Sequence, residues 1–419
     1  MKMTKYKLSE LVEVTRGASL SGQFYAEEGK LIRLTLGNFN MNGGGFKENT
    51  SKTDLYFTGT VRDEFILNEG DIITPLTEQS LGLLGTTARI PESGKYIQSQ
   101  DVALVRCKKG LLDPNFCYYL ISSSIVRQQL SAAAQQTKIR HTSPEKIKDC
   151  TVWVPDFDVQ KNIGRILTDI DNKIAINRQI NDNLEAMAKQ LYDYWFVQFD
   201  FPNEEGKPYK SSGGAMVWNE KLKREIPQGW SNGVLSDVAN ITMGQSPDGS
   251  SYNEDGEGII FYQGSTDFGL RFPDIRQYTT SPSRYANKGD ILMSVRAPVG
   301  ALNIANNDCC IGRGLSALSS KIGSMTHLYY LMNDFRLKFE GMNSAGTTFG
   351  SITKDELFSL PVIIPTKSVI SEFEQVCEPI FDKQMKIGEE INALTKQRDE
   401  LLPLLMNGQA TVNYHLSDD

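Results

Sequence analysis

Residue patterns that would support catalysis are few in this chain. The sequence contains no GxxxxGK[ST] loop for nucleotide phosphates and no GxGxxG after a predicted strand. The segment DPNF at 113–116 approaches the Asp/Asn-Pro-Pro-aromatic motif of amino-methyltransferases, but Asn115 stands where the second proline would be. A helix N-cap at Asp113 followed by Pro114 explains the same residues. We therefore expect no active site in this chain.

The cysteines and histidines do not have the spacing of a metal centre. The six cysteines form no CxxC pair, and only His141, His327 and His415 could join them. Such cysteines are typical of buried thiols in a reducing cytoplasm. The N-terminus lacks the apolar core of a secretory signal, and no stretch has the ~18–20 apolar residues of a membrane span. We expect a cytoplasmic protein without a bound metal.

The charge distribution leaves room for an anionic partner. The net charge of −7 argues against nucleic acid when it is taken alone. Phosphate binding, however, depends on local clustering of cations. Residues 270–313 carry only Asp274, Asp290 and Asp308 against a larger set of cations: Arg271, Arg276, Arg284, Lys288, Arg296 and Arg313. A basic face on an acidic protein is therefore possible.

The chain repeats its own sequence patterns after about two hundred residues. EGDIITPLTE at 69–78 matches KGDILMSVRA at 288–297, and TKIRHTSPEKIKDCTVWVP at 137–155 matches TTFGSITKDELFSLPVIIP at 347–365. This period is far longer than the roughly 20–50 residues of a solenoid unit. It predicts a duplicated globular domain, each copy followed by a long helix.

Each copy has the patterns of a mixed α/β domain. Short β-branched runs alternate with Gly, Pro, Asn and Ser turns, and one helix is predicted in each copy, over 113–130 and 325–342. Residues 201–230 are polar and rich in Gly, Ser and Pro, as in a linker. The predicted segments are a first domain (1–157), a first spacer helix (158–197), a linker (198–230), a second domain (231–366), a second spacer helix (367–408) and a tail (409–419).

The two spacer helices repeat apolar residues at the alternating spacing of a coiled-coil seam. Polar residues interrupt the seam at Asn177, Asn181, Gln384 and Arg398, where they would fix register and partner. Each helix could fold onto its own domain, but we favour antiparallel pairing, which would give the halves an approximate two-fold axis. We thus predict an α+β fold of two globular α/β domains joined by an antiparallel coiled coil. Its apolar seam residues are Ile163, Leu167, Ile170, Ile174, Leu184, Leu191, Cys377, Ile380, Ile387, Ile391, Leu394, Leu401 and Leu405.

Residues 153–196 resemble the central conserved region of the specificity (S) subunits of type I restriction–modification systems. In that family a Pro–x–x–x–x–Gln step leads into a helix with an I–L–x–x–I–D–x–K–I pattern. The matching residues are Pro155, Gln160, Ile163, Ile170, Asp171, Lys173 and Ile174. The segments ITMGQSPDGSSYN, FYQGSTDFG, GDILMSVRAPVG and CIGRGLSAL, between 241 and 318, are similar to a target-recognition domain of the same family.

The resemblance implies a DNA-recognition subunit without catalytic activity of its own. Each recognition domain would read one half of a split, asymmetric target in double-stranded DNA. The paired helices would set the unread spacer and dock two modification (methyltransferase) subunits. S-adenosylmethionine, ATP and Mg would be bound by the modification and restriction subunits and not by this chain. The alternatives are a stand-alone bivalent DNA-binding protein and a structural tether between protein partners.

Base reading in the major groove uses polar side chains carried on loops. In the first domain we predict DNA contacts from Asn38, Asn40, Thr77, Gln79, Ser80, Gln136, Lys138, Arg140 and His141. In the second we predict contacts from Gln245, Gln263, Ser265, Arg284, Arg296, Arg313 and Thr347. The cluster at 136–141 could instead be a solvated loop, and each arginine of the second domain could form an internal salt bridge. Tyr252 and Phe268 could stack on a base or belong to the core.

Overall fold

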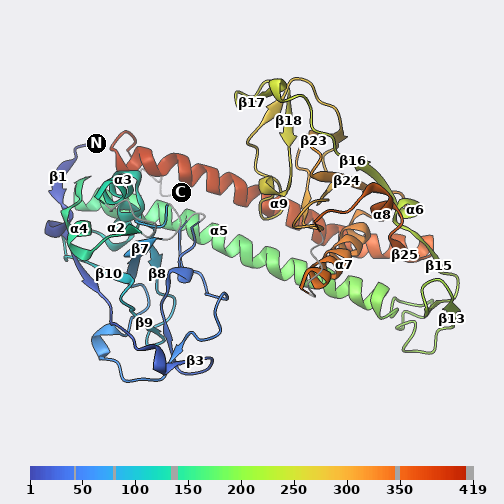
Figure 1. The fold of residues 1–419 in the computed structure, drawn as a ribbon, viewed down its shortest axis with the longest axis horizontal. Helices are drawn as coiled ribbons and strands as arrows, with labels where there is room; N and C mark the ends of the chain where they lie inside the picture. The colour runs from blue at the N-terminus through green and yellow to red at the C-terminus, as the bar shows by residue number, and fades with distance from the viewer. Residues whose placement is uncertain (42–43, 79–81, 134–139, 345–349, 412–419) are drawn as a thin grey trace, which may run out of the picture. The chain divides into compact units, whose positions relative to one another are not determined.

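Two long helices are the dominant elements of the computed structural model, which describes residues 1–41, 44–78, 82–133, 140–344 and 350–411. They are α5 (Phe157–Tyr192) and α9 (Lys367–Met406) (Figure 1). The chain divides into two compact units. Unit 1 comprises Met1–Ala175 and Ala393–Asp419, and unit 2 comprises Ile176–Asn392. Each long helix therefore contributes residues to both units.

Unit 1 is built around two four-stranded sheets. The order β2-β10-β6-β8 is antiparallel throughout, whereas β3-β5-β4-β9 contains one parallel pair, β4 with β9. The strands are β1 (Thr4–Lys7), β2 (Val12–Arg16), β3 (Tyr25–Ala26), β4 (Leu31–Arg33), β5 (Tyr56–Phe57), β6 (Ile72–Pro75), β7 (Thr77–Glu78), β8 (Ala88–Arg89), β9 (Tyr96–Ile97), β10 (Val102–Cys107), β11 (Arg140–His141) and β12 (Thr151–Val154). The helices are α1 (Leu8–Leu11), α2 (Pro114–Ser122), α3 (Ser124–Ala133) and α4 (Pro144–Asp149).

Unit 2 repeats this topology, with one more strand in its second sheet. Its sheets have the orders β16-β24-β21-β22 and β17-β19-β18-β23-β20, again with one parallel pair, β18 with β23. The strands are β13 (Met216–Asn219), β14 (Arg224–Pro227), β15 (Ser231–Val234), β16 (Ala239–Met243), β17 (Tyr252–Asn253), β18 (Ile259–Tyr262), β19 (Tyr278–Thr279), β20 (Tyr285–Ala286), β21 (Ile291–Ser294), β22 (Leu302–Ile304), β23 (Cys309–Ile311), β24 (Leu315–Ser320) and β25 (Pro361–Ile364). The helices are α6 (Leu235–Val238), α7 (Met325–Ser344) and α8 (Lys354–Phe358).

The long helices pair within each unit. In unit 2, Asn177 donates to Glu390 at 2.8 Å and Gln384 donates to Glu185 at 2.8 Å, so residue numbers rise on α5 as they fall on α9. The pairing is therefore antiparallel. In unit 1, Ile163 and Leu167 of α5 share a core with Leu405 and Met406 of α9. All thirteen predicted seam residues are buried or partly buried.

The helix predicted over 113–130 is in fact two helices. α2 ends at Ser122 and α3 begins at Ser124, because Ser123 has an extended backbone, with φ −66° and ψ 155°. The hydroxyl groups of Ser122 and Ser123 donate to carbonyls of the preceding turn. Such side-chain bonds compete with helical ones, which explains the break.

Residues 198–230 are folded, in contrast to the predicted linker. Strands β13 and β14 form a hairpin, and Phe199, Phe201, Ile226 and Trp230 are buried in the core of unit 2. Trp230 packs edge-on against Phe199 and stacks on Phe201 at 5.1 Å. The aromatic side chains supply enough apolar area for a core, although the segment as a whole is polar in composition.

Candidate functional site

In unit 2, backbone hydrogen bonds hold together the loops that carry five of the predicted DNA-contact residues. The amide of Gln245 donates to Ile311, the amide of Ile311 donates to Arg284, and the amide of Val295 donates to Gly314. The loops approach closely: a Cβ added at Gly244 would lie 2.2 Å from the carbonyl oxygen of Gly312. These contacts gather the following side chains on one group of loops: Gln245, Gln263, Arg284, Arg296 and Arg313.

Three arginines on these loops are available to a partner. Arg284, Arg296 and Arg313 are exposed, and none has a carboxylate within ion-pair distance among the residues that the structure describes. The other cations of the segment 270–313 are occupied. Arg271 is 8% exposed and pairs with Glu185 at 2.9 Å, Arg276 pairs with Asp267 at 3.7 Å, and Lys288 pairs with Glu389 at 3.7 Å. The basic face is therefore narrower than the sequence indicates.

The remaining predicted residues of unit 2 differ in accessibility. Gln245 and Gln263 are exposed and Ser265 is half-buried, while Thr347 lies outside the described residues. Tyr252 stacks on Phe261 at 4.8 Å and donates its hydroxyl proton to a backbone carbonyl, and Phe268 packs against a core cluster. Both rings thus have partners inside the domain. Tyr285, which is not among the predicted contacts, is 54% exposed and adjoins Arg284 in a turn rich in Ser and Pro.

In unit 1, the β7–β11 pair brings two distant parts of the sequence together. Thr77 lies opposite His141, and Glu78 lies opposite Arg140. His141 is exposed, whereas Thr77 is buried and donates to Asp101 at 3.2 Å. Arg140 lies 3.8 Å from the buried carboxylate of Glu78 and donates to Ser131. Arg140 therefore serves partly as an internal counter-ion.

The same position recurs in unit 2 with different side chains. Arg296 forms a bridge with Ser351. By the matched segments of the repeat, Arg296 occupies the place of Thr77, and Ser351 occupies the place of His141. The two units therefore present different chemistry at one shared structural position.

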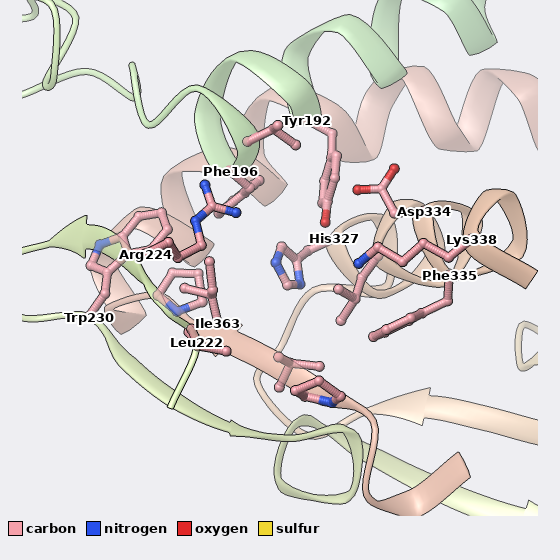
Figure 2. A pocket seen from close by; sticks show the side chains of 15 residues that line it. Tyr192, Phe196, Leu222, Arg224, Trp230, His327, Asp334, Phe335, Lys338 and Ile363 are labelled. Atoms are coloured by element: carbon pink, nitrogen blue, oxygen red, sulfur yellow. The ribbon is translucent and has the colours of Figure 1, made fainter. Parts of the chain in front are cut away.

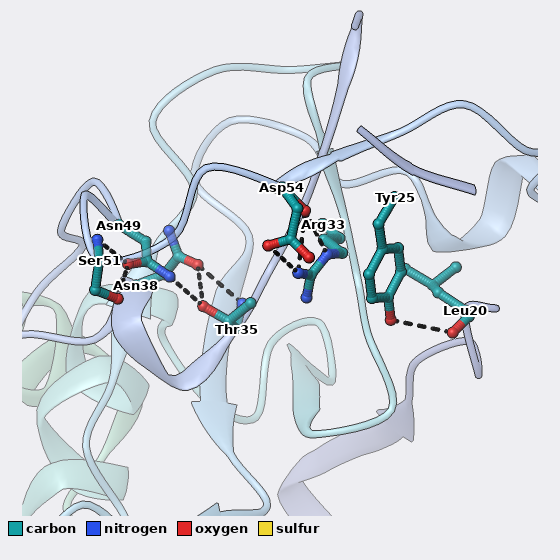
Figure 3. A network of polar contacts seen from close by, with 8 residues as sticks. All are labelled: Leu20, Tyr25, Arg33, Thr35, Asn38, Asn49, Ser51 and Asp54. Atoms are coloured by element: carbon teal, nitrogen blue, oxygen red, sulfur yellow. Dashed lines mark hydrogen bonds and ion pairs between the residues drawn. The ribbon is translucent and has the colours of Figure 1, made fainter. Parts of the chain in front are cut away.

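Asn38 does not offer its amide to a partner. It is 2% exposed; its Oδ1 accepts hydrogen bonds from the amide and hydroxyl of Thr35, and its Nδ2 donates to the carbonyl of Lys47. Figure 3 shows the contacts between Asn38 and Thr35 together with Asn49, which donates to the Thr35 hydroxyl at 2.8 Å. The side chain shapes its loop, so the prediction of a base contact is corrected. Asn40 is half-buried.

Four predicted contact residues lie outside the described residues. They are Gln79, Ser80, Gln136 and Lys138. Among the described residues, no group of three or more His, Cys, Asp or Glu side chains could hold a metal ion. Within the same residues, no helix has the length and apolar character to cross a membrane.

Comparison with known proteins gives the family of this chain. The family model of the type I restriction modification DNA specificity domain matches residues 1–186 and 227–402. The chain belongs to this specificity family. Among its relatives is a Methanocaldococcus jannaschii protein with the provisional name type I restriction enzyme MjaX specificity subunit. The two are 31% identical over 387 residues, which cover 86% of this chain and 85% of the relative.

Two further comparisons extend across the chain. The HindI specificity subunit of Haemophilus influenzae is 22% identical over 381 residues, covering 75% of this chain and 81% of that protein. A crystal structure of the type I S subunit from M. genitalium superposes with a TM-score of 0.62 at 17% identity, covering 97% of this chain and 96% of the other. The latter similarity supports the fold. The resemblance to specificity subunits is thus confirmed, and the specificity domain is present twice.

Proposed function

We propose that this specificity subunit reads a bipartite, asymmetric DNA target, one half with each unit. The observation that carries the proposal is a group of exposed arginines, Arg284, Arg296 and Arg313, on loops shared with Gln245 and Gln263. Within the described residues, no carboxylate lies within ion-pair distance of these arginines. Guanidinium groups bind phosphates and the major-groove edge of guanine, and glutamine amides match adenine. Because Arg296 and Ser351 replace Thr77 and His141 at the matched position, the two units would read different bases.

The helix pair would hold the unread spacer and dock methyltransferase subunits. The support is a stripe of exposed apolar side chains on α5: Ile176, Ile180 and Met187 are 54%, 39% and 53% exposed. Their spacing places them along one face of a helix. Exposed apolar patches of this kind are typical of protein interfaces. The chain would take part in methylation without a catalytic step of its own, and S-adenosylmethionine, ATP and Mg would be bound by its partners.

The test is methylation mapping of DNA from cells that make this chain with its cognate methyltransferase, against cells that lack only this chain. We expect a split motif, methylated at adenine in both halves, only when the chain is present. Identical methylation in the two strains, with an active methyltransferase, would contradict the proposal. A single contiguous methylated motif, without a second half, would contradict reading by two units.

A further inference from the structure

Unit 2 contains a cavity of about 280 Å³ at the end of α5. Figure 2 shows it between α5, the segment of the β13–β14 hairpin, α7 and β25. Tyr192, Phe196 and Trp230 supply aromatic walls. Phe196 belongs to a wide turn at residues 193–197, where the amide of Gln198 donates to the carbonyl of Asp193, five residues back. Wide turns of this type occur frequently at functional sites.

His327 is the buried polar group of this cavity. It is 3% exposed, and its Nδ1 atom has no hydrogen-bond partner among the described residues. Its ring lies 4.5 Å from that of Phe196 and 5.7 Å from that of Tyr192. Figure 2 shows His327 in the middle of the lining side chains. A buried polar atom without a partner is costly, so a ligand that hydrogen-bonds to it would bind favourably.

Two cations stand at the rim without ion-pair partners in the described part of the chain. Arg224 stacks on Phe199 at 4.9 Å and Lys338 lies 5.0 Å from the ring of Phe335. The lining also contains one carboxylate, Asp334, which is already paired with Lys189 at 3.3 Å. Lys189 lies outside the cavity and also pairs with Asp193, so it compensates the charge of Asp334 only in part. With Arg224 and Lys338 against Asp334, the lining still carries more cations than carboxylates.

The first repeat fills the matched positions with apolar side chains. FCYYL at 116–120 aligns with HLYYL at 327–331, so Phe116 takes the place of His327. Tyr192 and Phe196 near the end of α5 correspond to Leu402 and Met406 of α9. In unit 1 these residues belong to the apolar core or pack against it. The polar cavity is therefore a property of unit 2 and not of the duplicated fold.

We propose that this cavity is a binding site for a mononucleotide, a planar heteroaromatic ring that carries a phosphate. The ring would lie among the aromatic walls with its polar edge on His327. The phosphate would be held by Arg224 and Lys338 through charge-assisted hydrogen bonds. The volume suits a ligand at the small end of the range for such pockets, roughly 300–1,000 Å³.

Titration calorimetry of the full chain tests the proposal, with AMP, GMP, CMP and UMP as ligands and with adenosine and inorganic phosphate as partial ligands. We expect saturable binding of at least one nucleotide, with each partial ligand about tenfold or more weaker. Arg224→Ala and Lys338→Ala should each weaken nucleotide binding about tenfold. Lys221→Ala, at an exposed lysine of the same hairpin outside the cavity, should leave it unchanged.

His327→Phe restores the side chain of the first repeat and should abolish binding while the unfolding midpoint of the protein is retained. Undiminished binding in both His327→Phe and Arg224→Ala would place the nucleotide elsewhere, such as on the DNA-reading loops, and would overturn the proposal. Phosphate binding as tight as nucleotide binding would reduce the site to an anion site and would overturn it as well. So would the absence of saturable binding by all four nucleotides.

Discussion

His327 shows how burial changes the chemistry of one residue. Removal from solvent lowers the pKa of its imidazole to about 3, against about 6.5 in an unfolded chain. Between these values the unfolded chain binds a proton that the folded chain excludes. Stability is therefore fully present above about pH 6.5 and is lost as the pH falls toward about 3. The neutral imidazole can also form a hydrogen bond through Nδ1 with the polar edge of an uncharged heteroaromatic ring.

We predict that unit 2 loses about 1 kcal/mol of unfolding free energy between pH 6 and pH 5 through this histidine. Burial also raises the pKa of the Asp334 carboxyl, which favours the folded state at low pH and so opposes the effect of His327. The contribution of His327 is therefore isolated by comparison with a variant that lacks it. His327→Phe should remove the histidine contribution. Urea unfolding followed by the fluorescence of the buried Trp195 and Trp230 measures the difference; equal pH dependence in both proteins would contradict the prediction.

Arg296 is the residue at which DNA reading by unit 2 is most directly tested. With the target taken from methylation mapping, Arg296→Ala should weaken binding about tenfold or more, because a lost guanidinium contact costs roughly 1–3 kcal/mol. Arg276→Ala is the matched control, since that side chain pairs with Asp267. Mobility-shift titrations at several salt concentrations provide the measurement. If the two variants bind DNA equally well, Arg296 makes no contact.

At this scale the sequence predicted which loops are polar but not which side chains are free. Arg140 and Arg271 looked equivalent to Arg296 and Arg313 as loop cations. The difference arises from partners far along the chain: Arg271 meets Glu185 of α5, and Arg140 meets Glu78. Such pairing depends on tertiary contacts that local composition does not encode.

Among the elements, α5 contributes one carboxylate in each unit that ties a domain to the helix pair. In unit 1, Asp171 accepts from the Tyr119 hydroxyl at 2.6 Å and from Arg398 at 3.0 Å. In unit 2, Glu185 accepts from Arg271 at 2.9 Å and from Gln384 at 2.8 Å. In each case α9 supplies one donor and the domain supplies the other. The polar seam residues Gln384 and Arg398 therefore set helix register and domain position together.

We predict that Arg398→Met destabilises unit 1 by about 1–2 kcal/mol, because the Asp171 carboxylate loses its counter-ion. The cost is lower than for a fully buried pair, because the Asp171 side chain is 29% exposed to solvent. The double variant with Asp171→Asn should be less destabilised than the sum of the single variants. Lys396→Ala, at an exposed pair on the same helix, should change stability by less than about 0.5 kcal/mol. Urea unfolding followed by circular dichroism provides the values; strict additivity would show that the pair is not coupled.

The exposed stripe of α5 makes a separate prediction about assembly. Ile180→Glu should weaken association with the methyltransferase about tenfold or more, because a charge would be buried in an apolar contact. Asp182→Ala, an exposed residue nearby on the helix, is the control. Co-purification followed by analytical ultracentrifugation measures the complex, and DNA binding by the isolated chain should be unchanged. Full assembly by Ile180→Glu would place the docking surface elsewhere.

The helices were the most predictable elements, because a seam repeated over about eight turns in each helix is a strong local pattern. The folded segment 198–230 with its hairpin was not predicted, since the core residues Phe199, Phe201 and Trp230 are separated by polar stretches. The break at Ser123 also escaped the pattern, because apolar periodicity continues through it.

Across the whole molecule, duplication provides two copies of one fold, and divergence at matched positions makes them non-equivalent. His141 in unit 1 and Ser351 in unit 2 occupy the same place beside β7 and Arg296 respectively. The cavity around His327 has its counterpart in a filled core around Phe116. A duplicated reader with identical units would read a symmetric target, so the differences between units predict an asymmetric one.

This asymmetry predicts that the two halves of the methylated motif can be altered separately. His141→Ala should relax base preference in one half only, and Arg313→Ala should relax it in the other, with the spacer length unchanged in both. Because the two residues belong to different units, their effects on binding free energy should add to within about 0.3–0.5 kcal/mol in the double variant. Methylation mapping of the three strains reads out both halves at once. A change by either variant in both halves, or in the spacer, would mean that the units do not read independently and that the helix pair transmits the substitution.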